Sequence, residues 1–76
     1  MNNRIETVVG NNIRTLREKA GITQELLATK LLLLGCNITR SALAKIEVGQ
    51  RHLYPDEVIC IKNVLKVSYD DIFDVN

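Results

Sequence analysis

Four residues in the middle of the chain have the spacing of a single helical face. They are Arg40, Ser41, Ala44 and Lys45, at positions i, i+1, i+4 and i+5. No acidic residue occurs from position 38 to position 46, so this face would not repel phosphate, and an arginine can bind a guanine edge through two hydrogen bonds. Such a face can enter the major groove of DNA. The alternative is an ordinary solvated face, which usually carries charges of both signs.

The residue types and their spacing give less support to a catalytic site or a metal site than to a DNA-binding face. Cys36, His52 and Cys60 lack the spacing of a zinc site, and no signature of a Cys–His nucleophile surrounds them. A helical chain of 76 residues seldom encloses a cleft for general acid–base work. We therefore expect no enzyme activity, metal, cofactor or small-molecule ligand. The two cysteines are expected to be reduced thiols that pack as small apolar side chains.

Length and composition favour one globular domain spanning residues 1–76. Aromatic residues make up only 4% of the chain, so the core must be aliphatic, and the composition argues against a single-strand binder that stacks bases on aromatic side chains. Residues 1–52 carry eight Lys/Arg and four acids, whereas residues 53–76 carry two Lys and five acids. One half could therefore meet a polyanion while the other faces away; the alternative, which composition alone favours, is a solvated surface with uneven charge. Nothing resembles a signal peptide or a membrane span, which predicts a cytoplasmic protein.

The elements that would position these residues are helices. A stripe of apolar residues predicts a first helix from about residue 4 to residue 20; its members are Ile5, Val9, Ile13, Leu16 and Ala20. Asn2 or Asn3 can cap its start, and Gly21 marks its end. Gly10, inside this helix, could permit a close approach by a neighbouring helix.

Four further helices follow, each opened by a recognisable residue. Thr23 and Thr39 are good N-caps for helices over about 23–34 and 39–48. Pro55 suits the first turn of a fourth helix, whose expected apolar residues are Val58, Ile59, Ile61 and Leu65. Ser68 and Asp71 resemble a capping box for a short fifth helix. No stretch alternates like a strand, so the fold class is all-α.

Several motifs in order resemble the lambda-repressor-like family, the Cro/repressor or XRE-type helix-turn-helix proteins. They are Leu16-Arg17, then Ala20-Gly21-Ile22-Thr23-Gln24-Glu25, Ala28, the run from Thr39 to Arg51, and Val67-Ser68-Tyr69-Asp70-Asp71-Ile72-Phe73. The resemblance covers nearly the whole chain. It implies a compact five-helix domain whose second helix crosses the DNA backbone and whose third helix lies in the major groove.

The resemblance also implies roles for individual residues. Those matching DNA-contacting positions of the family are Gln24, Thr39, Arg40, Ser41, Ala44, Lys45, Gln50 and Arg51. Among them, Arg40, Ser41, Ala44 and Lys45 match positions that read bases, and Gln24, Thr39, Gln50 and Arg51 match positions near phosphates. Arg17 and Glu47 match a structural pair that clamps the first helix to the end of the third.

The sequence departs from the family between its second and third helices. Leu32-Leu33-Leu34-Gly35-Cys36-Asn37 makes this connection about five residues longer than the usual turn. Either the second helix gains a turn or the loop bulges, and both options affect how Gln24 and Arg40 could act together. The three leucines cannot all face one core, so one or two are expected to be exposed. They could contact a partner, such as a second copy, or form a slightly enlarged core.

The leading functional hypothesis is sequence-specific binding to double-stranded DNA by a bacterial or phage-type transcriptional regulator. A module of this size buries little DNA surface, so a homodimer on an inverted-repeat operator is expected. The alternative hypothesis is a protein-interaction module, antitoxin-like or anti-repressor, that keeps the fold without reading an operator.

Overall fold

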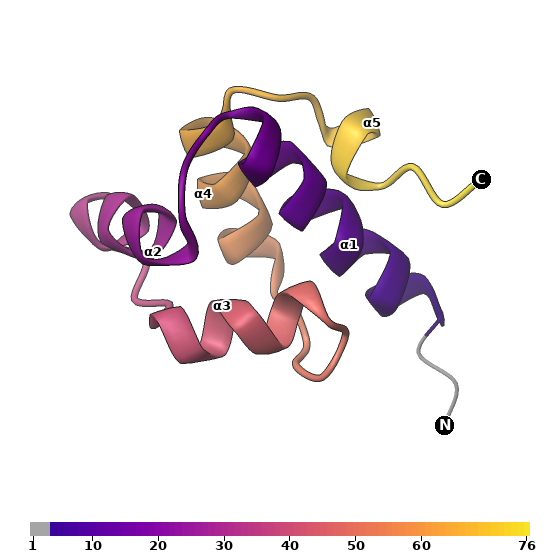
Figure 1. The fold of residues 1–76 in the computed structure, drawn as a ribbon, viewed down its shortest axis with the longest axis horizontal. Coiled ribbons are helices and arrows are strands. Elements are labelled where there is room, and N and C mark those ends of the chain that lie inside the picture. Colours follow the sequence, from indigo (N-terminus) through magenta and orange to yellow (C-terminus); the bar gives the residue numbers. More distant parts are fainter. Residues whose placement is uncertain (1–3) are drawn as a thin grey trace.

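Five helices arranged around one core make up the computed structural model, which describes residues 4–76 (Figure 1). In chain order they are α1 (Arg4–Lys19), α2 (Gln24–Leu33), α3 (Arg40–Glu47), α4 (Pro55–Leu65) and α5 (Tyr69–Ile72). Residues 4–76 contain no strand, which confirms the all-α class. The predicted helix ends were correct to within two residues. Asn2 and Asn3, the predicted caps of α1, lie outside the described residues.

Side-chain caps open three of the helices as the sequence predicts. The Oγ1 atoms of Thr23 and Thr39 each accept a hydrogen bond, at 3.1 Å, from the backbone N–H three residues later. At the start of α5, Ser68 Oγ accepts from the backbone N–H of Asp71, and an Asp71 carboxylate oxygen accepts from the backbone N–H of Ser68. These bonds satisfy N–H groups that have no partner within the helix, and so they locate each helix start.

Aliphatic side chains from all five helices build the core, as the composition predicts. Its buried members are Val9, Ile13, Leu27, Leu31, Cys36, Ile38, Leu43, Ile46, Val58, Ile61, Leu65 and Ile72. The expectation that Ile5 and Ile59 would also face inward is wrong, since they are 61% and 48% exposed. Both line a groove at the surface, where no further element covers them.

Close backbone packing joins α1 to α3 through Gly10. A Cβ atom at this position would collide with the backbone carbonyl oxygen of Ile46, near the end of α3. Glycine is therefore required here because the two helices approach more closely than any side chain allows. The predicted close approach at Gly10 is confirmed, and it places the end of α3 directly against α1.

The long connection between α2 and α3 is part helix and part loop. Helix α2 continues two residues past the buried Leu31, and residues 34–39 form the loop. The backbone N–H of Cys36 returns to the Leu31 carbonyl at 2.9 Å, and Cys36 and Ile38 are buried. The loop thus folds back onto the core.

The three leucines of this connection all face solvent. Leu32, Leu33 and Leu34 are 59%, 81% and 56% exposed. The expectation that only one or two would be exposed is wrong, and these leucines do not enlarge the core. Leu31, Cys36 and Ile38 already fill this part of the core, which leaves the intervening leucines outside. Within residues 4–76, no helix combines the length and apolar character needed to cross a membrane.

Candidate nucleic-acid interface

Helix α3 lies at one edge of the molecule (Figure 1). Arg40, Ser41 and Lys45 are exposed and Ala44 is half-buried, whereas the opposite face of α3 enters the core. Neither Arg40 nor Lys45 forms an ion pair with any residue in the described range 4–76. The predicted face therefore exists as an exposed, acid-free surface whose two cations are available to a ligand.

A buried ion pair holds the far end of α3. Arg17 Nε donates to Glu47 Oε2 at 2.7 Å, and Arg17 Nη2 donates to Glu47 Oε1 at 3.1 Å. Arg17 Nη1 also donates to the carbonyl of Ile22 at 2.8 Å, in the turn before α2. Hydrogen bonding to Glu47 raises the pKa of the Arg17 guanidinium above its ordinary value. The clamp implied for Arg17 and Glu47 is confirmed, and it reaches the α1–α2 turn as well.

Gln24 joins this clamp from the first residue of α2. Its Nε2 atom donates to Glu47 Oε1 at 3.0 Å. The start of α2 is therefore tied to the end of α3, at the opposite end of α3 from the long connection. One N–H of the Gln24 amide remains for another acceptor such as phosphate. The position of Gln24 relative to α3 is therefore held by its hydrogen bond to Glu47, although the connection between α2 and α3 is long.

Two other predicted phosphate contacts flank α3. Thr39 is exposed, and its hydroxyl accepts the capping bond from Ala42, so the hydroxyl proton is free to be donated elsewhere. Gln50 is exposed just beyond the other end of α3, where its backbone N–H donates to the Lys45 carbonyl at 2.8 Å. Both residues therefore border the exposed face of α3.

Arg51 has an internal role that the sequence did not indicate. Its Nη1 and Nη2 atoms donate to Glu57 Oε1 and Oε2 at 2.8 and 3.0 Å, and Nη1 also donates to the His52 carbonyl. The Glu57 carboxylate further accepts from the backbone N–H of Tyr54 at 3.0 Å. Hydrogen bonding to Arg51 lowers the pKa of Glu57 from its ordinary value of 4.5. Arg51 therefore organises the loop that leads into α4, and no helical spacing relates it to Glu57.

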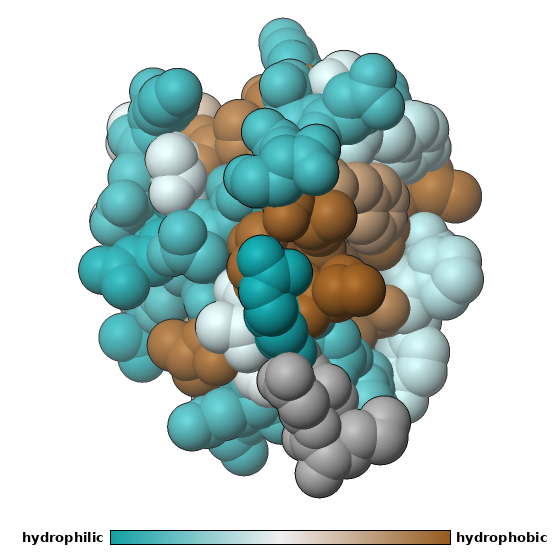
Figure 2. All heavy atoms as spheres, turned by 90° about the vertical axis from the view of Figure 1, so that its right-hand side faces the viewer, coloured by the Kyte–Doolittle hydropathy of each residue, from teal (hydrophilic) through white to brown (hydrophobic). Residues whose placement is uncertain are grey.

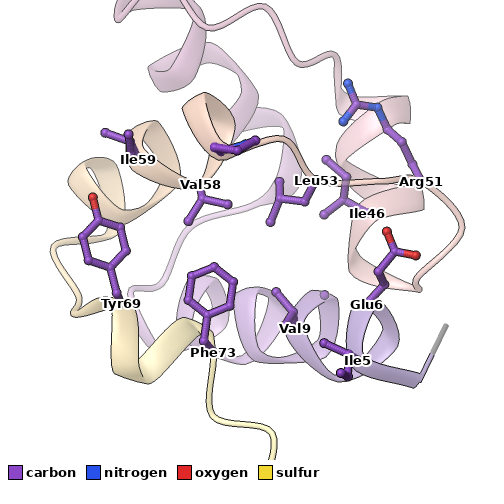
Figure 3. Close-up of a pocket in the computed structure, with 12 residues that line it drawn as sticks. Ile5, Glu6, Val9, Ile46, Arg51, Leu53, Val58, Ile59, Tyr69 and Phe73 are labelled. Carbon is purple, nitrogen blue, oxygen red and sulfur yellow. The ribbon is translucent and has the colours of Figure 1, made fainter.

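An apolar groove occupies a second face of the molecule. Figure 2 shows apolar side chains gathered in the middle of the face that carries α5 and the beginning of α1. The groove has a volume of about 450 Å³, and Figure 3 shows its walls. Its apolar lining residues include Ile5 and Val9 of α1, Val58 and Ile59 of α4, and Tyr69 and Phe73 at α5. The sequence did not predict it, because its residues come from four separate helices, α1, α3, α4 and α5, and from the loop between α3 and α4.

The groove has one polar end. Glu6 and Arg51 lie there, apart from the α5 aromatics in Figure 3. His52 Nδ1 contacts the Glu6 carboxylate, so the loop after α3 is also joined to α1. Within residues 4–76 no group of three or more His, Cys, Asp and Glu side chains could hold a metal ion.

Comparison with known proteins identifies the class. The model of a helix-turn-helix family, HTH_3, matches residues 13–72, which include the second part of α1 and all of α2 to α5. The chain therefore belongs to the lambda-repressor-like, XRE-type helix-turn-helix family. Members of this family bind DNA, typically as transcription regulators, and are not usually enzymes. No curated protein and no solved structure matches the chain.

Proposed function

We propose that this protein is a small transcriptional regulator of bacterial or phage type that binds a specific DNA operator in the cytoplasm. Residues 1–76 act as one DNA-binding domain and need no cofactor. The observation that carries the proposal is the surface of α3, where Arg40 and Lys45 are exposed without an acidic partner while Glu47 holds the end of the helix. A rigid, cationic helix of this kind fits the major groove.

The proposed contacts divide into base reading and positioning. Arg40 and Ser41 read the first bases from the start of α3, and Ala44 and Lys45 read later ones along the same face. Phosphates are contacted from both sides of α3; the residues proposed for this are Gln24, Thr39, Gln50 and Arg51. Gln24 and Arg51 would use the N–H groups that their internal hydrogen bonds leave free. Phosphate contacts orient the helix, and base contacts give specificity.

Two copies act together in this proposal. A single module of this size buries too little DNA surface for tight binding, so a homodimer would bind an inverted repeat with half-sites about 34 Å apart. The symmetry of such a dimer matches the two-fold symmetry of the operator.

Selection of bound duplexes from a random library tests the proposal directly. We expect an enriched inverted repeat. Arg40→Ala should relax the base preference at one position of each half-site and cost about 1–3 kcal/mol of binding free energy. Lys66→Asn is the matched control, because it removes one exposed positive charge outside α3 at a left-handed position that asparagine accepts. An unchanged preference in Arg40→Ala, or the absence of any enriched sequence, would contradict the proposal.

The three exposed leucines of the connection favour a second candidate, a protein-interaction module. Salt dependence separates the two candidates. Binding that uses several phosphate contacts weakens steeply as the salt concentration rises, whereas binding of a protein partner to an apolar surface responds weakly. We expect the steep dependence, measured by fluorescence anisotropy on a labelled duplex. Binding of non-specific and selected duplexes that is both weak and insensitive to salt would favour the protein-interaction module.

A further inference from the structure

The apolar groove is a surface hollow that no element of residues 4–76 fills. Its volume of about 450 Å³ lies within the range of about 300–1,000 Å³ that is typical of small-molecule sites. Ile5, Ile59 and Phe73 line the groove and are 61%, 48% and 47% exposed. A ligand that covered these side chains would remove apolar surface from water, which is favourable. The groove therefore has the size and the lining of a ligand site.

One carboxylate gives the polar end of the groove its charge. Of the residues that line the groove, Glu6 and Arg51 are charged. The Arg51 charge is already balanced, because its Nη1 and Nη2 atoms donate to the two carboxylate oxygens of Glu57. Glu6 contacts His52, and within residues 4–76 no Lys or Arg forms an ion pair with it. At neutral pH, with histidine uncharged, this end of the groove carries one negative charge.

The Glu6 carboxylate can accept more hydrogen bonds than the contact it already makes. An ionised carboxylate has about four acceptor sites, and the contact with His52 uses one of them. The Glu6 side chain is 31% exposed, so a ligand can reach it. A second and more polar hollow shares Glu6 and Arg51 with the groove. A charged group bound at this end would therefore keep some contact with water, which lowers the cost of its desolvation.

We infer that the groove binds a small, mainly apolar molecule that ends in an ammonium group. The apolar body of the ligand lies along α1 and α4, and its ammonium group donates to the Glu6 carboxylate. The sequence predicted no small-molecule ligand, because the lining residues come from separate elements. The inference goes beyond the proposed function and does not depend on it, since neither Arg40 nor Lys45 lines the groove.

The two ends of the groove set the orientation of the ligand. Tyr69 and Phe73 lie toward the end opposite Glu6 (Figure 3). Aromatic rings offer large apolar surfaces and pack favourably against another ring. A rigid molecule with an aromatic body and a terminal ammonium group therefore matches both ends, with its rings near α5 and its charge near the loop after α3.

Three probes of one shape test the inference on the full chain in the absence of DNA. They are biphenylmethylamine, biphenylmethanol and biphenylcarboxylate, which share an apolar body and end in an ammonium, a hydroxyl and a carboxylate group. We expect saturable binding of the amine, with changes in the amide NMR signals of Val9, Val58 and Phe73. The alcohol should bind about tenfold more weakly, because it lacks the charge-assisted hydrogen bond to Glu6, and the carboxylate more weakly still.

The same titrations can overturn the inference. An amine that does not saturate, or that changes signals only outside the groove, would show that the groove is not its site. An alcohol that binds as tightly as the amine, or a carboxylate that binds more tightly, would show that the groove does not select an ammonium group.

Two substitutions at the polar end separate the charge of Glu6 from the position of the loop. Glu6→Gln removes the charge and should weaken binding of the amine about tenfold while leaving the alcohol unchanged. His52→Ala removes the contact with Glu6 but keeps the carboxylate, so binding of the amine should be equal or tighter. Glu25→Gln, at an exposed position of α2 outside the groove, is the matched control. Equal losses in Glu6→Gln and in either of the other two variants would overturn the inference.

A substitution in the apolar wall tests the other part of the site. Ile59→Gln places an amide in the wall and should weaken the amine and the alcohol alike, by about fivefold. Leu33→Gln is the matched control, because it changes an exposed apolar side chain outside the groove and should alter neither affinity. Both positions are at the surface, so the fold should persist, and thermal unfolding checks this. If Leu33→Gln weakened binding and Ile59→Gln did not, the probes would bind at the exposed leucines and the inference would be wrong.

Discussion

The carboxylate of Glu47, at the end of α3, lies 2.7 Å from the Nε atom of Arg17 on α1, in an ion pair almost fully shielded from solvent. Gln24 adds a hydrogen bond to the same carboxylate from the start of α2. Three helices therefore meet at one side chain. The placement of the proposed base-reading face depends on this meeting point, which is buried away from that face.

Breaking this ion pair from one side should destabilise the protein strongly. Arg17→Met leaves the Glu47 charge buried without its main partner, at a cost of about 3–5 kcal/mol in the free energy of unfolding, measured in urea. Arg14→Met is the matched control, because Arg14 pairs with Glu18 on the exposed side of the same helix and its loss should cost under about 1 kcal/mol. Equal effects of the two substitutions would contradict the structural role assigned to Arg17.

The double variant Arg17→Met/Glu47→Leu should recover much of this loss, since it removes both buried charges together. A recovered free energy of unfolding would show that the loss in Arg17→Met comes mainly from the unpaired buried charge and not from altered packing. A double variant no more stable than Arg17→Met would show that packing dominates.

Gly10→Ala should destabilise the protein although it improves helix propensity. In an exposed helix this change stabilises by about 1 kcal/mol. Here the new methyl group meets the Ile46 carbonyl, and separating α1 from α3 should cost about 1–3 kcal/mol or more, which outweighs the gain. Asn11→Ala, at the exposed neighbouring position, is the control and should be neutral or slightly stabilising in thermal unfolding. A raised midpoint for Gly10→Ala would mean that the helices are not so closely packed.

Stability should fall in acid through Glu57. Arg51 lowers the pKa of this carboxyl in the folded chain below its ordinary value of 4.5, so the paired carboxylate stabilises the fold above that pH. As the pH falls from about 5 through the lowered folded pKa, protonation removes this contribution. Glu57→Gln should therefore show a flatter decline in the free energy of unfolding over that pH range. An identical decline in the variant and the wild type would exclude Glu57 as a source of acid sensitivity.

The exposed leucines are the surface that we expect a second copy to cover. Leu33 is 81% exposed, the highest value among the large exposed hydrophobic residues, so burying it would remove the most apolar surface from water. Leu33→Gln should weaken cooperative binding to an inverted repeat about tenfold, a loss of ~1.4 kcal/mol, and leave binding to a single half-site unchanged. Ile59→Gln, in the apolar groove, is the control. If Ile59→Gln instead abolished cooperativity, the groove would be the dimer interface.

Local signals predicted the helix boundaries well. Thr23, Thr39, Pro55 and Ser68 each open a helix, because a cap or a fixed φ angle acts within a few residues of its own position. The Arg17–Glu47 ion pair was predicted from the family resemblance and not from the spacing of residues. It joins positions thirty apart, which local patterns do not connect.

The surface features were harder to predict, for a geometric reason. Helical periodicity tells which residues share a face but not whether a neighbouring element is long enough to cover that face. Ile5 and Ile59 share faces with core residues, yet they border the open groove. The family pattern predicted a phosphate contact for Arg51. It did not predict the Arg51–Glu57 ion pair, because no local pattern shows that the loop brings the two side chains together.

Because α3 is anchored at Glu47, we expect the exposed positions of the lengthened segment before it to tolerate an insertion. Gly35 and Asn37 are exposed in this segment, and in addition to the Thr39 cap at its start, α3 is held by the hydrogen bonds of Glu47 at its other end. A short peptide epitope grafted at Gly35 could thus be displayed without shifting the DNA-reading helix, which would make this bend a convenient attachment point for labels or fused domains.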